Sequence, residues 1–106
     1  MLSIYQQNTP TWTFTITYST SGSAVDLTGS VLHFICKDGS TTIFDITCDL
    51  ADDPKTGICT AKPTSAQTKD AGIHPVELSV RWTADSTTLT LYRNDLEIKS
   101  TLYTWS

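Results

Sequence analysis

Two runs of alternating apolar and polar residues dominate this chain, and each predicts a β-strand with one buried face. In residues 11–18 threonine recurs on one face, and the other face holds Trp12, Phe14, Ile16 and Tyr18. In residues 73–83 the second run places on one face His74, Val76, Leu78, Val80 and Trp82. Because successive side chains of a strand point to opposite sides, each apolar set is expected to face the core.

Shorter apolar runs predict the remaining strands. A weak alternation at the start of the chain indicates a short edge strand in residues 2–7. Further strands are expected in residues 30–37, 41–50, 58–61, 87–92 and 96–105. Polar turns separate the strands, and one such turn is expected at residues 93–95, between the last two of them.

The sequence Asp38-Gly39 predicts a hairpin between the strands on either side of it. A three-residue loop would place Phe34 opposite Phe44, whereas a two-residue loop would place Asp45 on the core face. Burial of an unpaired carboxylate is costly, so the three-residue loop is favoured.

The segments between strands carry weaker signals. Residues 19–23 form a polar turn, and in residues 25–29 Val25 and Leu27 are expected to cap one end of the core. Pro75 predicts an edge position or a bulge near the start of its strand. Residues 62–71 have no period of two and allow at most a single helical turn.

These elements predict one all-β domain over residues 1–106, an immunoglobulin-like antiparallel β-sandwich of seven or eight strands. Hydrophobic residues make up 39% of the chain, which indicates a globular protein. The Cys…Trp…Cys spacing of antibody domains is missing, so the likeness to them concerns architecture only.

The charge distribution argues against two classes of partner. The net charge is −4, and the seven basic residues are scattered along the sequence, so no nucleic-acid partner is expected. No apolar run approaches the roughly 20 residues that a membrane helix needs, so no membrane partner is expected. The N-terminus lacks the pattern of a secretory signal, which predicts synthesis in the cytoplasm.

The three cysteines, Cys36, Cys48 and Cys59, have no CxxC spacing, and their odd number leaves at least one thiol unpaired. Buried reduced thiols are the favoured interpretation. The alternative is a single disulfide between Cys48 and Cys59.

No catalytic or metal-binding constellation is recognisable. His33 and His74 share no ligand spacing with the cysteines. Asp49, Asp52 and Asp53 lack the alternation and the closing Glu of a calcium loop. A GxSxG elbow and a glycine-rich phosphate loop are both missing. The sequence therefore predicts no enzyme, no cofactor and no metal.

The aromatic residues offer a few candidates for an interface. Trp12 and Trp82 lie on faces assigned to the core. Trp105, Tyr103 and Tyr5 lie close to the chain ends and are the candidate interface residues. Exposed aromatic rings on a β-sandwich can also stack on sugars, which leaves carbohydrate binding as an alternative function.

The order of motifs resembles the N-terminal domain of phage baseplate upper proteins and related immunoglobulin-like modules of phage tails. Its most distinctive part is Val25-Asp26-Leu27-Thr28-Gly29. The other parts are the strand at residues 13–17, the hairpin end Lys37-Asp38-Gly39, the strand at residues 44–47, the sequence Thr56-Gly57-Ile58 and residues 71–78. The resemblance covers nearly the whole chain.

The resemblance implies a structural protein of the virion, made in the cytoplasm of a bacterial host. Such a module would anchor or assemble a fibre or receptor-binding component on a tail or baseplate. Its expected partners are other virion proteins and further copies of itself. A decoration module of the capsid or of a head fibre is a further alternative.

Overall fold

The alternating run at residues 73–83 forms one long strand in the centre of a sheet. The computed structural model describes residues 1–101. Its larger sheet has five strands in the order β1-β8-β7-β3-β4. Their bounds are Leu2–Tyr5 for β1, Thr88–Lys99 for β8, Gly72–Trp82 for β7, Ser30–Asp38 for β3 and Thr41–Thr47 for β4.

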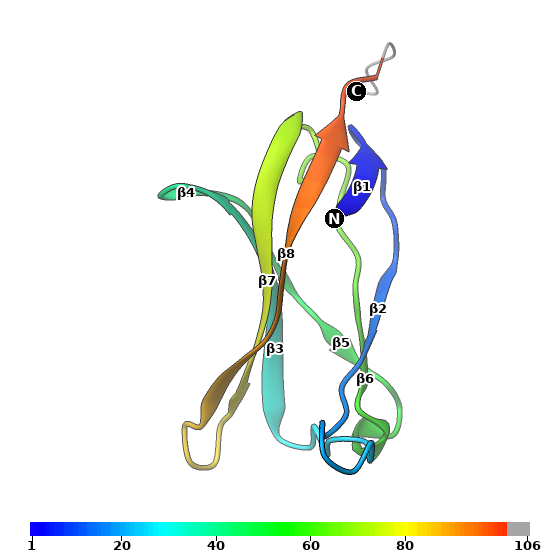
Figure 1. The fold of residues 1–106 in the computed structure, drawn as a ribbon, viewed down its shortest axis with the longest axis vertical. Helices are drawn as coiled ribbons and strands as arrows, with labels where there is room; N and C mark the ends of the chain where they lie inside the picture. Colours follow the sequence, from blue (N-terminus) through cyan, green and yellow to red (C-terminus); the bar gives the residue numbers. More distant parts are fainter. Residues whose placement is uncertain (102–106) are drawn as a thin grey trace.

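The smaller sheet has three strands in the order β2-β6-β5 and packs against the larger one (Figure 1). Its strands are β2 (Trp12–Thr15), β6 (Ile58–Ala61) and β5 (Asp49–Leu50), and a short 3-10 helix, η1 (Pro54–Thr56), precedes β6. The eight strands confirm the expected all-β sandwich. No helix in the described part of the chain is long and apolar enough to cross a membrane.

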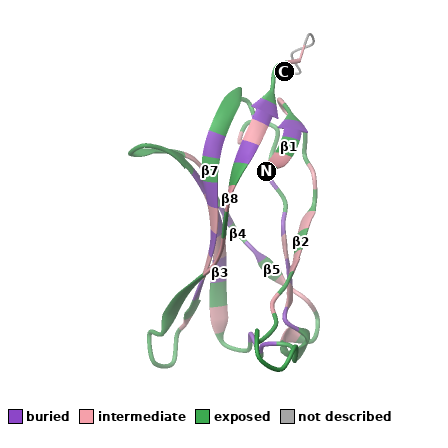
Figure 2. Ribbon diagram, in the orientation of Figure 1, coloured by how far each residue is buried: buried purple, intermediate pink, exposed green. Residues whose placement is uncertain are grey.

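The core lies between the two sheets, where Figure 2 shows the buried segments of the strands. Phe34 is at its centre and is fully buried. Its ring lies 5.2 Å from that of Trp12, 5.1 Å from that of Phe14 and 5.8 Å from that of Phe44, measured between centroids. Since Phe34 and Phe44 belong to the larger sheet and the other two rings to the smaller one, this cluster joins the sheets.

The clip at residues 25–29 closes one end of this core, as expected. Val25 and Leu27 are buried. The backbone N–H of Leu27 donates to the carbonyl of Pro54 over 3.0 Å, which ties the clip to η1. Gly29 has a φ of 73°, a conformation that glycine adopts without strain as the chain turns into β3.

The β3–β4 hairpin closes through a two-residue loop, residues 39–40, so the expected three-residue loop is wrong. The pairing changes with it. Phe34 lies opposite Ile46 rather than opposite Phe44.

A β-bulge in this hairpin keeps Asp45 out of the core. The pairing shifts by one residue between Cys36 and Lys37. Without the shift, the tight loop would place Asp45 opposite Phe34 on the buried face. With it, Asp45 lies opposite Ile35 on the outward face. The bulge thereby removes the objection to a short loop.

Residues 41–50 form two strands rather than the single strand expected. β4 ends at Thr47 and β5 begins at Asp49, in the other sheet. Between them the N–H of Cys48 donates to the carbonyl of Leu32 over 2.8 Å. The alternation of buried and exposed residues continues where the chain passes from one sheet to the other, because Cys48 is buried, as Ile46 is.

The turn expected at residues 93–95 does not form, because β8 runs through it as one strand. Arg93, Asn94 and Asp95 pair with residues 75–77 of β7. The strand therefore ends at Lys99, and the predicted strand at residues 96–105 extends in part beyond the described residues. β1 is an edge strand as expected, but it pairs with β8 in parallel, so the sandwich is not purely antiparallel.

Three smaller expectations also change. The strand expected at residues 11–18 is shorter, because β2 ends at Thr15 and Tyr18 is exposed. Pro75 has no bulge; the register shift in the β7–β8 pairing lies at Leu78 and Ser79, where β8 has the extra residue Leu91. Pro75 does not lie on an edge strand, because β7 is a central strand. It nevertheless has no paired residue on β3, because the β3–β7 pairing ends one residue earlier, at Cys36 with Val76.

Residues 62–71 form a hydrogen-bonded loop without a helix. Thr68 is fully buried, and its hydroxyl donates to the carbonyl of Asn8 over 2.8 Å. The N–H of Gln7 donates to the carbonyl of Thr68 over 3.0 Å. These bonds hold the loop against the end of β1. The sequence of the loop has no alternating pattern, so its ordered conformation was not predicted.

Candidate assembly surfaces

Tyr5 is the one candidate interface residue that the described structure includes. It lies at the end of β1, an edge strand, and its side chain is exposed. The Lys99 ammonium lies 5.5 Å from the centre of its ring, close enough for a cation–π contact. Tyr103 and Trp105 lie outside the described residues.

The edge of β8 is open over most of its length. β1 pairs only with Leu96 to Lys99, so in the described structure residues 88–95 have a strand on one side only, β7. A groove of about 350 Å³ runs between this part of β8 and β2, lined among others by Phe14, Ile16 and Tyr92. Open edges and half-covered apolar side chains are features through which sheet proteins assemble.

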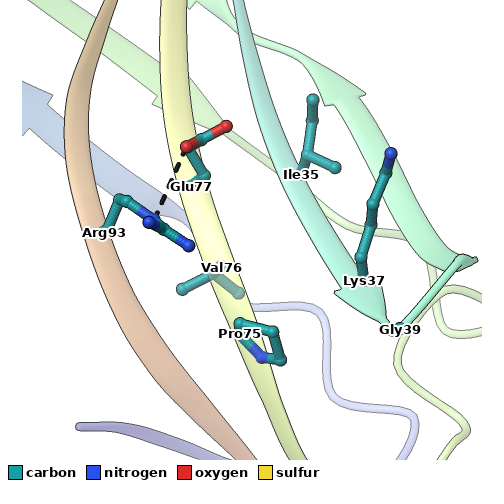
Figure 3. A pocket seen from close by; sticks show the side chains of 7 residues that line it. All are labelled: Ile35, Lys37, Gly39, Pro75, Val76, Glu77 and Arg93. Atoms are coloured by element: carbon teal, nitrogen blue, oxygen red, sulfur yellow. Dashed lines mark ion pairs between the residues drawn. The ribbon is translucent and has the colours of Figure 1, made fainter.

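The outward surface of the five-stranded sheet is hollowed in two adjoining places. We call it the outer face: the outward side chains of β3, β4, β7 and β8. One hollow, of about 270 Å³, is shown in Figure 3 and is lined by Ile35, Lys37, Gly39, Pro75, Val76, Glu77 and Arg93. The other, of about 250 Å³, shares Ile35 with it and also includes Val31 and Arg81.

Both carboxylates in these hollows already have a nitrogen partner on a neighbouring side chain. Glu77 Oε1 lies 3.6 Å from Arg93 Nε (Figure 3). Asp45 Oδ1 lies 2.7 Å from His33 Nδ1. Because these pairs are partly exposed to solvent, each contributes little to stability. Two further carboxylates, Asp95 and Glu97, face the same side from β8, because they pair with Pro75 and Ile73 of β7.

The pair of His33 and Asp45 lies near Ser79, which sits opposite His33 in the β3–β7 pairing. These residue types form catalytic triads elsewhere. Here the Ser79 hydroxyl donates to Glu77 Oε2 over 3.3 Å, so its hydrogen bond points to a carboxylate and not to the imidazole. The geometry therefore does not activate Ser79 as a nucleophile.

His74 is buried, as its place on the apolar face of β7 predicts. Its Nε2 lies 3.1 Å from the carbonyl of Asp70, which connects β7 to the loop at residues 62–71. Its Nδ1 lies 4.0 Å from the carboxylate of Asp38 and has no hydrogen-bond partner in the described structure. These contacts give His74 a role in packing.

All three cysteines are buried free thiols, as expected. Burial raises the pKa of Cys36 from 9.0 to about 12, and the charge of Asp38 adds to the rise. A hydrogen bond with Cys59, together with burial, raises the pKa of Cys48 as well. The alternative interpretation, a disulfide between Cys48 and Cys59, is not seen, although the two thiols are neighbours.

Within residues 1–101 no three His, Cys, Asp or Glu side chains cluster as a metal site requires.

Comparison of the whole fold with solved structures gives a clear match. The chain is similar to the N-terminal domain of phage TP901-1 ORF48, with a TM-score of 0.59 and 9% sequence identity. The match covers 93% of this chain and 84% of that one.

The fold is similar to that of this phage domain. At 9% identity the likeness concerns the fold alone. No protein-family model matches the chain, and no curated protein matches it in sequence.

The outer face is the surface that sequence reasoning missed. Lys37 and Arg81 lie 44 positions apart in the sequence, and only the pairing of β3 with β7 brings them to one face. The alternating pattern does predict that the basic side chains of β3 and β7 point outward. It does not predict that these two strands are neighbours, so it does not predict that the basic side chains share a surface.

Proposed function

We propose that this chain is a structural module of a phage virion that anchors or assembles a fibre or receptor-binding component on a tail or baseplate. The observation that carries the proposal is the similarity to the N-terminal domain of phage TP901-1 ORF48 over 93% of this chain. The same class of protein was indicated by the motif order around Val25 to Gly29. The proposal gives the chain no catalytic role.

The surfaces of the module support assembly. The edge of β8 and the exposed Tyr5 on β1 offer backbone and aromatic groups to a neighbour. The hollowed outer face offers apolar area bordered by charges. Further copies of this chain and other virion proteins are the partners that these surfaces are proposed to bind.

The test is the composition and appearance of phage particles. In the phage whose genome encodes the chain, the coding sequence is deleted, and the protein is supplied again from a plasmid as the control. Quantitative mass spectrometry of purified particles is expected to find the chain in a fixed ratio to the tail proteins. Electron microscopy is expected to show particles without the distal fibre when the chain is absent.

Two results would overturn the proposal. The first is that purified wild-type particles contain none of the chain, and the second is that the deletion leaves complete particles that adsorb normally. A chain found on capsids and missing from isolated tails would instead support a capsid or head-fibre module.

Carbohydrate binding has less support from the described structure. Trp12 packs edge-on against Phe34, and the indole N–H of Trp82 donates to the carbonyl of Asp26 over 3.4 Å. Among residues 1–101 the tyrosines with the most exposed rings are Tyr5 and Tyr18. They lie on different elements, so the described surface presents no platform of aromatic rings for a sugar.

A further inference from the structure

One side of the sandwich is open between two sheet edges. In the described structure β2 pairs only with β6, and residues 88–95 of β8 pair only with β7. The groove of about 350 Å³ lies between these two strands. We call it the edge groove: the free edges of β2 and of residues 88–95, with the side chains between them. Backbone groups on both edges are therefore available to an added strand.

The edge groove is apolar and only half covered. It is lined by Phe14 and Tyr92, whose ring centroids lie 6.0 Å apart, and by the buried Leu78. Next to it, Leu89 pairs with Val80 and so faces the core side of β8, yet Leu89 is 48% exposed. A segment that covered this side of the sandwich would therefore remove apolar surface from water.

The described lining of the edge groove contains no charged side chain. Its polar part includes Thr13, Thr15 and Thr17, and the rest is aliphatic or aromatic. A charged side chain would lose hydration there without gaining an ionic partner. The edge groove therefore favours an extended, uncharged segment with apolar side chains.

Residues 100–106 have this chemistry. They contain no charged side chain, although 17% of the residues in the chain are charged. Tyr103 and Trp105 alternate with smaller side chains, so on an extended segment they would face the same side. Tyrosine, tryptophan and threonine, which make up most of residues 101–105, also favour strands. The segment and the edge groove thus match in charge and in apolar character.

This segment cannot reach the edge groove of its own copy. The N–H of Thr101 donates to Gln6 Oε1 over 3.1 Å, which holds the chain beside the end of β1 (Figure 1). Tyr92 lies seven residues before Lys99, which is roughly 23 Å along β8, and Thr101 lies beyond Lys99. The four residues that follow Thr101 span at most about 14 Å. Trp105 therefore falls short of Tyr92 in the same copy.

We infer that residues 102–106 of one copy bind in the edge groove of a second copy, as a strand added to the free edge of β8. Hydrogen bonds between main chains provide affinity, and the side chains of Tyr103 and Trp105 provide specificity by covering the apolar lining. The inference deepens the proposed function, on which it rests for the place of assembly, by naming the surfaces through which copies join.

The segment and the groove are different surfaces, so the contact is heterologous. Two copies can exchange their segments in a closed pair, or each copy can pass its segment to the next in a ring or filament. In either arrangement one groove takes one segment.

Photo-crosslinking tests the contact directly. Benzoylphenylalanine replaces Tyr103 in the unlabelled full chain, which is mixed with the ¹⁵N-labelled wild type and irradiated. The expected products join the unlabelled peptide that carries the probe to ¹⁵N peptides from β2 or from residues 88–95. Links within one copy only, or intermolecular links only to other regions, would overturn the inference.

Substitution in the segment measures the strength of the contact. Trp105→Ala is expected to weaken self-association about tenfold in sedimentation equilibrium, because it removes a large aromatic contact. Thr104→Ala is the matched control, because position 104 lies on the opposite side of an extended segment. It is expected to have a much smaller effect.

Substitution beside the groove tests the other surface. Leu89→Lys places a charge at the apolar side of β8 and is expected to weaken self-association about tenfold. Thr88→Lys is the control, because Thr88 is also exposed on β8 but pairs with Arg81 and so faces the outer side. It adds the same charge and is expected to have a much smaller effect.

A mixture of two variants makes the test specific. The Trp105→Ala protein keeps an intact groove, and the Leu89→Lys protein keeps an intact segment. Each alone is expected to associate weakly, whereas the mixture is expected to form heterodimers through the one contact that remains. Circular dichroism checks that each variant is folded.

Several results would overturn the inference. These are a wild-type protein that stays monomeric at about 1 mM, equal effects of a variant and its control, or a mixture that forms no heterodimers. These measurements need no phage particle. A chain that is present in virions but fails them would refute the contact and leave the proposed function standing.

Discussion

At the scale of single residues, Gly57 occupies a position that no other residue can share without strain. It ends η1 with a φ of 71° and is buried. A Cβ atom added there would collide with the carbonyl oxygen of Ile16 and approach the backbone of Val25. Glycine thus allows the clip, β2 and η1 to meet at one point.

The prediction concerns Gly57→Ala. The positive φ that the alanine must adopt and the collision of its Cβ atom with the Ile16 carbonyl oxygen are together expected to lower the free energy of unfolding by about 2–4 kcal/mol. Gly39→Ala is the matched control, because Gly39 has a φ of 61° with open space around it, and it should cost only about 1 kcal/mol. Urea denaturation measures both. Equal losses would show that the close approach at Gly57 has no energetic effect.

A second residue-scale prediction concerns Cys36 at high pH. Burial raises the pKa of this thiol from 9.0 to about 12. Between those values the unfolded chain loses the proton and the folded chain keeps it, so the folded state binds more protons and stability falls as pH rises. The stability is fully present below about pH 9 and is lost as the pH approaches about 12.

The test compares the wild type with Cys36→Ala. The variant is expected to lose stability less steeply between about pH 9 and pH 11, with a slope smaller by up to about 1.4 kcal/mol per pH unit. All other ionisable groups are the same in both proteins, so the difference in slope isolates the thiol. Parallel curves would contradict the prediction.

At the scale of elements, β8 shows how pairing overrides a local signal. Residues 93–95 have the polar composition of a turn, yet they remain extended because β7 pairs with each of them. Their side chains find polar partners there: Arg93 pairs with Glu77, and the side-chain amide of Asn94 donates to the hydroxyl of Tyr92 over 2.7 Å. Tertiary pairing thus decides between strand and turn.

Amide hydrogen exchange checks this strand by NMR. In residues 88–95, amides that point toward β7 are expected to exchange slowly and those that point to the open edge quickly, in alternation. In residues 96–99, where β1 pairs on the other side, protection is expected at successive amides. Fast exchange at all of residues 93–95 would indicate the turn instead.

At the scale of the whole molecule, the two sheets share one core. Phe34 on the larger sheet contacts the rings of Trp12 and Phe14 on the smaller one. The chain also crosses between the sheets at Cys48. Neither sheet can therefore be lost without exposing the apolar face of the other, which favours cooperative unfolding.

The prediction is that Phe34→Ala destabilises both sheets together. Removing this buried ring is expected to cost about 3–5 kcal/mol. Val31→Ala is the control, because Val31 lies on the same strand but is 40% exposed on the outer face, and it should cost much less. NMR signals from residues in β2 and in β7 should disappear at one denaturant concentration. Separate transitions would show two independent units.

Much of the core was predictable from alternation alone. Leu32, Val76 and Val80 are buried on the faces that the pattern predicts, and the clip residues Val25 and Leu27 are buried as well. The candidate interface was less predictable. Tyr5 is exposed on an edge strand, but nothing local to Lys37 or Arg81 indicates that they share a surface.

The sequence by itself determined which side of each long strand is buried, because a period of two residues fixes the face whatever the neighbour is. Only the tertiary structure decided which strands are neighbours, where β4 passes into β5, and that β1 runs parallel to β8. It also decided that the cations of β3 and β7 lie on one outer face. These features depend on hydrogen bonds between segments far apart in the chain, and no local pattern of side chains encodes such pairings.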